Sequence, residues 1–179
     1  PAEARRFIND GKLVMILGVE ASEVLDCGRT GDTPHCTEAQ IDQRLDELYG
    51  LGVRSLFPVH KFDNALGGTA YDDGATGLLV NVGNKWATGE WWQPVPCEPG
   101  AEADNSPTNL SGEQELIYAV LGVGVAPLLG GDLPAYPPGP LCNPRGLTDL
   151  GIHTIEAMAA RGMIVETDHL SVKARKEAL

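Results

Sequence analysis

Three polar residues follow three apolar segments of this sequence, and their types are those that bind metal ions. Glu20 comes directly after residues 13–19, His60 after residues 53–59, and His169 shortly after a third apolar segment. Carboxylate and imidazole groups are common ligands of zinc, so these residues are candidate metal ligands if the fold brings them together. The alternative is structural, since a histidine near a strand end often meets a local hydrogen bond and a glutamate there can turn to solvent.

The elements around these residues alternate between helix and strand. Thr37 and Gln40 form a capping box at the start of one helix, and Thr148 and Ser171 are typical N-caps of two others. A strand–helix–strand unit in one sheet is parallel, so its polar end residues should meet at one edge. The predicted order is a helix over 2–10, a strand over 13–19 buried on both faces, a helix from Thr37, a strand over 53–59, a helix from Thr148, a strand over 163–165 and a helix from Ser171.

Residues 66–145 interrupt this alternation with many glycine, proline and polar positions. A stretch of this length is too long for an ordinary loop, so we expect a lid or subdomain inserted into a single domain over 1–179. Within it, residues 108–121 are a candidate helix. The three tryptophans of the insertion either line a substrate pocket or form a small core of the insertion itself.

Composition excludes some classes of partner. The chain has 179 residues, is 42% hydrophobic and carries a formal net charge of -12. This acidic balance argues against nucleic acid and anionic membrane surfaces, which both favour lysine and arginine. No apolar run reaches the roughly 20 residues that a membrane-spanning helix needs. We therefore expect no nucleic-acid partner and no membrane span.

The sequence has four cysteines, which all lie in polar or Gly/Pro-rich stretches. Four cysteines can form two disulfides in three different pairings. The simplest pairing joins Cys27 to Cys36 and Cys97 to Cys142. Free thiols and a zinc site remain alternatives, although the sequence contains no C-x-x-C pair. Disulfides would indicate an oxidising compartment and hence an extracellular or periplasmic location.

Three segments together resemble the membrane (renal) dipeptidase family of the amidohydrolase superfamily. They are residues 11–20, which end in Gly-Val-Glu; residues 45–60, in which Leu-Tyr-Gly-Leu-Gly-Val-Arg precedes a strand ending in histidine; and residues 146–171, which contain His-Leu-Ser. The resemblance covers about half of the chain. It implies an α/β fold made of parallel βα units from a TIM-type (β/α)8 barrel, incomplete here, with the long irregular insertion.

The resemblance also implies a function and a role for each candidate residue. The family hydrolyses dipeptides and related amides with two zinc ions. Glu20 would then bridge the two metals, His169 would bind one of them, and His60 would be the catalytic residue that contacts the substrate and steadies the tetrahedral intermediate. Asp63 and Asn64, which follow His60 closely, are the candidate substrate-binding residues.

The sequence departs from the family in two ways that bear on activity. It contains no H-x-D pair, which supplies two metal ligands in the family, and it covers only about three barrel strands. We therefore expect remaining barrel segments, or another chain, to complete the site for a small-molecule or dipeptide substrate. The isolated chain is expected neither to hold two zinc ions nor to hydrolyse dipeptides. The alternatives are a phosphodiesterase-type hydrolase on the same scaffold and a non-catalytic, degenerate barrel or ligand-binding module.

Overall fold

A computed structural model of the chain describes residues 2–105 and 134–179. At its centre lies a parallel sheet of three short strands, in the spatial order β1 (Leu17–Val19), β4 (Val53–Leu56) and β7 (Ile164–Val165). The parallel pairing of sequential strand–helix units, which the sequence predicted, is confirmed. Among the described residues the sheet stays open and forms no closed barrel.

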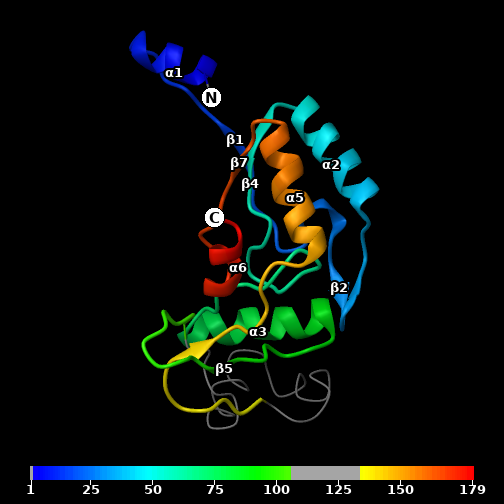
Figure 1. Cartoon of the computed structure of the whole chain (residues 1–179), viewed down its shortest axis with the longest axis vertical. Helices are drawn as coiled ribbons and strands as arrows, with labels where there is room; N and C mark the ends of the chain where they lie inside the picture. Colours follow the sequence, from blue (N-terminus) through cyan, green and yellow to red (C-terminus); the bar gives the residue numbers. More distant parts are fainter. Residues whose placement is uncertain (1, 106–133) are drawn as a thin grey trace.

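Two helices cover one face of the sheet, as Figure 1 shows. They are α2 (Glu38–Gly50) and α5 (Asp149–Ala160), and both have the predicted N-caps: Thr37 forms its capping box with Gln40, and Thr148 accepts a hydrogen bond from the Gly151 amide. Their apolar side chains pack with those of the strands into the main core. The core includes Ile41, Leu45, Leu56 and Met158, all fully buried.

A third helix follows the last strand closely. α6 (Val172–Glu177) begins at the predicted cap Ser171, whose hydroxyl accepts a hydrogen bond from the Ala174 amide and donates one to the Arg145 carbonyl. This double use of one hydroxyl ties the start of α6 to the chain that returns from the insertion. These two hydrogen bonds fix the backbone two residues after His169, the third candidate ligand.

The predicted insertion contains regular structure and a small core. The described part holds α3 (Gly74–Thr88) and an antiparallel pair of strands, β5 (Val95–Pro96) and β6 (Leu141–Cys142). Trp92 is fully buried with its ring 5.0 Å from that of Tyr71, which agrees with a core of the insertion. The candidate helix over 108–121 lies outside the described residues.

Both predicted disulfides form, Cys27–Cys36 and Cys97–Cys142, and they use all four cysteines. The first closes a small loop that carries a short hairpin of β2 (Arg29–Thr30) and β3 (Thr33–Pro34), directly after a 3-10 turn, η1 (Val24–Asp26). The second joins β5 to β6. Such bonds are typical of oxidising compartments. No described helix is long and apolar enough to cross a membrane.

The N-terminal apolar run differs from its prediction. Only Leu17–Val19 forms a strand, whereas Leu13 and Met15 are 91% and 79% exposed. The expectation that residues 13–19 are buried on both faces is wrong, because β1 pairs on one side only with β4 and no described helix covers the run. The preceding helix, α1 (Ala2–Asn9), has its predicted position and stands clear of the sheet in Figure 1.

Candidate metal centre

Glu20, His60 and His169 meet at the C-terminal edge of the parallel sheet. One potential ligand atom from each residue lies within 4.8 Å of those of the others. The Glu20 Oε1 atom is 3.0 Å from His60 Nε2 and 3.2 Å from His169 Nε2, so the carboxylate lies between the two imidazoles. The predicted convergence of these three residues at one edge is thus observed, although they are 40 and 109 positions apart along the chain.

The strand ladder brings these residues to a common level. The Phe57 amide donates to the Val19 carbonyl just before Glu20, and the Glu166 amide donates to the Leu56 carbonyl. Each strand therefore leaves the sheet at nearly the same height, where parallel α/β proteins place their ligand sites. The order of elements in the sequence is sufficient to predict this result.

A short bridge from the insertion fixes the backbone of both histidines. The Thr69 hydroxyl donates to the His60 carbonyl at 2.5 Å, and the Ala70 amide donates to the His169 carbonyl at 2.9 Å. Thr69 is fully buried, which makes these bonds sheltered from water. Sequence reasoning missed this bridge, because nothing in the local pattern around residue 69 indicates contact with segments 9 and 100 positions away.

The two imidazole rings also contact each other. Their centroids lie 4.5 Å apart with the rings nearly perpendicular, and the Phe57 ring lies 5.7 Å from that of His169. Edge-to-face packing of this kind holds rings in fixed orientations. Phe57 is a second residue that the sequence did not single out, and its aromatic position at a strand end is the signal that could have found it.

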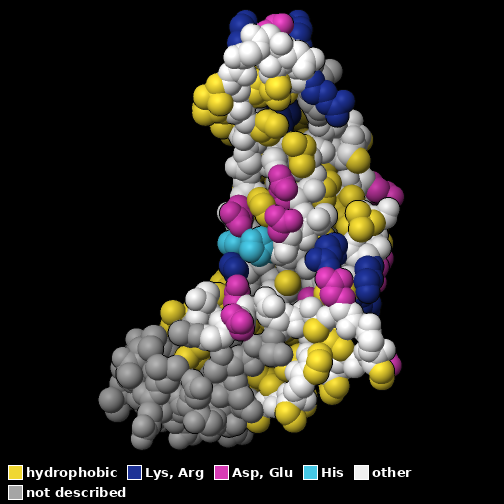
Figure 2. All heavy atoms as spheres, turned by 90° about the vertical axis from the view of Figure 1, so that its left-hand side faces the viewer, with side chains coloured by type: hydrophobic (Ala, Val, Ile, Leu, Met, Phe, Trp, Pro, Cys, Tyr) yellow, Lys and Arg dark blue, Asp and Glu magenta, His cyan; other side chains and the backbone are white. Residues whose placement is uncertain are grey.

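Burial lowers the pKa of His60, and the nearby charges of His169 and Lys61 lower it further, whereas Glu20 and Asp72 oppose the shift. The neutral imidazole is therefore favoured, which is the form that binds a metal ion. The side chains of His60 and His169 are 21% and 27% exposed, and that of Glu20 is 45% exposed. The group is partly sheltered and remains open to solvent. Figure 2 shows histidine side chains together on one face of the molecule, with acidic and basic side chains beside them.

Asp63 and Asn64, the predicted substrate-binding residues, are almost fully buried. The Asn64 amide group donates to the Pro58 and Ser22 carbonyls, and its oxygen accepts from two backbone amides of the following turn. Its polar atoms are thus engaged within the protein. These hydrogen bonds hold the loop after His60, and the predicted role of Asp63 and Asn64 in substrate binding stays a prediction.

Asp63 belongs to a buried charge cluster that the sequence did not reveal. Its carboxylate lies 3.7 Å from the Arg29 guanidinium and 4.0 Å from that of Arg145, and it accepts hydrogen bonds from the Thr69 amide and the Asn143 side chain. Burial raises the pKa of Asp63, while these hydrogen bonds and arginines oppose that rise. The cluster joins the first hairpin, the loop after β4 and the end of the insertion.

The two acidic residues just before His169 also stay outside the group. Glu166 accepts a hydrogen bond from the Ser55 hydroxyl at 2.5 Å, across the pair of strands β4 and β7. Asp168 is exposed. Of the acidic and histidine residues between β7 and α6, His169 is the one that belongs to the group with Glu20 and His60.

The donor set agrees with a cation site. Two imidazole nitrogens and one carboxylate are a ligand set known from catalytic zinc sites, in which the fourth position stays open for water or substrate. Among the described residues this is the only group of three or more histidine, cysteine and acidic side chains with such geometry. It supplies ligands for one ion, and no described group supplies a second set.

No protein-family model, no curated protein and no solved structure matches this chain. The site therefore has to be interpreted from its own residues and from the arrangement of the sheet.

Proposed function

We propose that this protein is part of a metal-dependent hydrolase in which Glu20, His60 and His169 hold a zinc ion. The observation that supports it is the convergence of three ligand atoms within 4.8 Å at the edge where parallel sheets bind their ligands. When bound, such an ion polarises a carbonyl group and lowers the pKa of a coordinated water. A peptide or related amide bond is the substrate that the resemblance to membrane dipeptidases implies.

The role of the chain's own residues follows from their positions. Glu20 would provide the charge that a divalent ion needs, and its Oε1 atom lies 3.0 Å from His60 Nε2 and 3.2 Å from His169 Nε2. His60 stays neutral because its burial lowers its pKa, and the Thr69 hydroxyl holds its backbone. All three side chains keep solvent-exposed surface, through which water and substrate would reach a bound ion.

His60 either contacts the substrate or binds the metal ion, and these two roles predict different effects of its substitution on zinc affinity. In the two-zinc site that the resemblance implies, Glu20 bridges the ions and His60 contacts the substrate. In a one-ion site His60 is itself a ligand. We favour the ligand role, because the His60 Nε2 atom is as close to the Glu20 carboxylate as that of His169 is.

The remaining features of the hydrolase are proposals of the same kind. They are a TIM-type barrel completed by further barrel segments or another chain, a second zinc ion bound with ligands from those segments, and an extracellular or periplasmic location. On this view the chain alone binds one ion and does not hydrolyse dipeptides, because residues 2–105 and 134–179 contribute one group of three ligands and a sheet of three parallel strands. The alternatives are a phosphodiester substrate and a non-catalytic ligand-binding module.

Metal titration of the purified chain tests the proposal. Calorimetry with zinc should give one site, and Glu20→Gln should weaken zinc binding at least tenfold, as should His169→Ala. Asp168→Asn is the matched control, because it removes an exposed carboxylate next to the site and should leave the affinity unchanged. A chain that binds no zinc, or that binds it equally well after Glu20→Gln, would contradict the proposal.

Two further measurements separate the finer alternatives. If His60 is a ligand, His60→Ala lowers zinc affinity; if it only contacts substrate, zinc affinity is retained. Activity is then measured on the protein together with the segments or chain that complete the barrel, against a panel of dipeptides and phosphodiesters. Cleavage of phosphodiesters alone would replace the amide substrate, and cleavage of neither would favour the binding module.

A further inference from the structure

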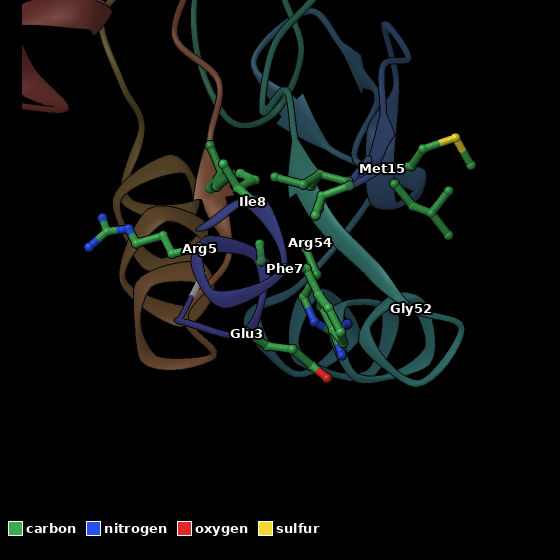
Figure 3. Close-up of a pocket in the computed structure, with 12 residues that line it drawn as sticks. Glu3, Arg5, Phe7, Ile8, Met15, Gly52 and Arg54 are labelled. Carbon is green, nitrogen blue, oxygen red and sulfur yellow. The ribbon is translucent and has the colours of Figure 1, made fainter. Parts of the chain in front are cut away.

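The two ends of the parallel sheet adjoin different parts of the chain. At the starts of the strands lies an apolar groove of about 620 Å³, which Figure 3 shows between α1, the segment that follows it, and Arg54 of β4. None of the described residues that line this groove belongs to the insertion. At the opposite end, where Glu20, His60 and His169 meet, the insertion donates hydrogen bonds to the backbone of both histidines.

This contact is made by a closely packed segment at the start of the insertion. Thr69 forms an antiparallel bridge with Leu170, and the Ser171 amide donates to the Gly68 carbonyl at 2.8 Å. A Cβ atom at Gly68 would lie against the Arg145 carbonyl oxygen, closer than van der Waals contact allows, so only glycine permits this approach of two backbones. The segment is thereby fixed beside the residues that follow His169.

The Thr69 hydroxyl has one proton and lies near the backbone oxygens of both histidines. It is 2.5 Å from the His60 carbonyl oxygen and 3.3 Å from that of His169, which also accepts a hydrogen bond from the Ala70 amide at 2.9 Å. Thr69 is fully buried, so water does not replace the hydroxyl if it is removed. A buried carbonyl left without its donor costs free energy, and the backbone at His60 would move to find another.

Movement of that backbone would displace a ligand atom. Only two side-chain torsions separate the backbone of a histidine from its ring, and the first is restricted to staggered values. The rings of His60 and His169 also contact each other, with centroids 4.5 Å apart. Metal–ligand distances tolerate deviations of only about 0.2 Å. Residues that orient ligands without touching the ion therefore change metal affinity by about 10- to 100-fold when substituted.

Thr69 is itself held by two buried polar residues. Its amide donates to the Asp63 carboxylate at 2.9 Å, and its carbonyl accepts from the Asn143 side chain at 2.9 Å. Asn143 directly follows Cys142, whose disulfide with Cys97 joins β6 to β5. The last described part of the insertion thus holds in place the segment that contacts the two histidines.

We propose that Thr69 is a positioning residue of the metal centre, and that the folded insertion sets the affinity for zinc through it. This inference rests on the proposed zinc site, with His60 and His169 both as ligands. It gives the insertion a role different from that of a lid, because a lid controls access of substrate and leaves metal affinity unchanged. None of the described residues of the insertion belongs to the ligand group, so the effect is indirect.

Zinc calorimetry of the full chain and its variants tests the inference. Thr69→Val keeps the shape of the side chain but removes the hydroxyl, and should raise the zinc dissociation constant about tenfold. Thr69→Ser keeps the hydroxyl and should bind nearly as tightly as the native chain. Thr154→Val is the matched control, because Thr154 is also fully buried and its hydroxyl donates to the Leu150 carbonyl at 2.7 Å within α5. Urea denaturation should show a similar loss of stability in both valine variants, with a loss of affinity only in Thr69→Val.

The outcomes separate this inference from the metal centre itself. A native chain that binds no zinc contradicts the metal centre, and the inference is lost with it. Zinc binding that Thr69→Val leaves unchanged contradicts the inference alone. An equal fall of affinity in Thr154→Val does so too, because the effect would then come from lost stability.

Should Thr69→Val fail to fold, hydrogen exchange on the native chain decides. Zinc should slow exchange of the Ala70 amide, which bonds to the His169 carbonyl. The reference is the Leu51 amide at the exposed end of α2, whose exchange should stay the same. An Ala70 amide that exchanges equally fast with and without zinc would show that the bridge and the ion are not coupled.

Discussion

This molecule contains two clusters of charged and polar side chains, and the clusters differ in how much of their surface is exposed to water. Glu20, His60 and His169 keep between 21% and 45% of their side-chain surface exposed. Arg29 and Asp63 keep 3% and 4%. Both groups join segments that are distant in the sequence, yet only the first retains an open side.

The difference shows why proximity of ionisable residues is insufficient evidence of a binding site. The Asp63 carboxylate is surrounded by two arginines and two hydrogen-bond donors, so its interactions are satisfied within the protein. Charges taken out of water require such partners. In the Glu20 group, by contrast, three potential ligand atoms lie within 4.8 Å of one another, and all three side chains keep exposed surface.

The largest expected effect comes from breaking the buried group. Asp63→Ala should lower the free energy of unfolding by about 3–4 kcal/mol, because it removes one of the two carboxylates that pair with the buried Arg29, the other being Glu90. It also removes the acceptor of the Thr69 amide and of one Asn143 side-chain hydrogen bond. Urea denaturation measures this change. Asp32→Ala is the control: Asp32 also pairs with Arg145 but is 92% exposed, so its loss should change stability little. Equal losses in the two variants would mean that burial does not separate the two groups.

The second largest effect is expected from zinc binding to Glu20, His60 and His169, which should stabilise the folded chain. Zinc at about 100 times its dissociation constant should raise the free energy of unfolding by about 2.7 kcal/mol, since the folded chain binds it and the unfolded chain does not. Denaturation with zinc, and again with a chelator, measures the difference. His169→Ala should abolish it, whereas Asp168→Asn should retain it. Stabilisation that survives His169→Ala would place the ion elsewhere.

A smaller effect is expected from Ser55→Ala, which tests whether a hydrogen bond outside both clusters affects zinc binding. The Ser55 hydroxyl donates to Glu166, which follows β7 but lies outside the metal-ligand group. Its loss should cost about 1 kcal/mol of stability, as for an ordinary hydrogen bond. Zinc affinity, measured by calorimetry, should stay the same. A fall in affinity would instead assign Glu166 a part in orienting the ligands.

The smallest effect is a dependence of stability on pH in the metal-free chain. Because burial lowers the pKa of His60, the folded state binds a proton there less readily than the unfolded state, whose pKa is about 6.5. Stability is therefore full above that value and falls as the pH drops through the lower pKa of the folded state. Thermal unfolding at several pH values should show this loss, and His60→Gln should reduce it. An unchanged profile in His60→Gln would contradict the shift.

Local patterns predicted much of the framework correctly. The caps at Thr37, Thr148 and Ser171 depend on one hydroxyl and the next few amides, so they can be recognised without knowledge of the fold. The convergence of Glu20, His60 and His169 was likewise predictable, because parallel strands joined by helices must end at one edge. The disulfide pairing was the simplest of three and is the one observed.

Other features depend on contacts that no local pattern encodes. The burial of Asp63 and Asn64 was not predicted, because their adjacency to His60 in sequence indicates nothing about which way the loop turns. The exposure of Leu13 and Met15 was also unexpected, since an apolar run indicates burial only if another element is there to cover it. The bridge from Thr69 to His60 appears only when the insertion is folded.

By itself the sequence determined the type and order of the elements, their caps, and the edge of the sheet at which its three candidate ligands lie. These depend on residues a few positions apart or on the fixed chirality of strand connections. Only the tertiary structure decided which polar groups are buried and satisfied, which keep exposed surface, and which apolar surfaces remain uncovered. Burial and pairing are properties of segments brought together from distant parts of the chain.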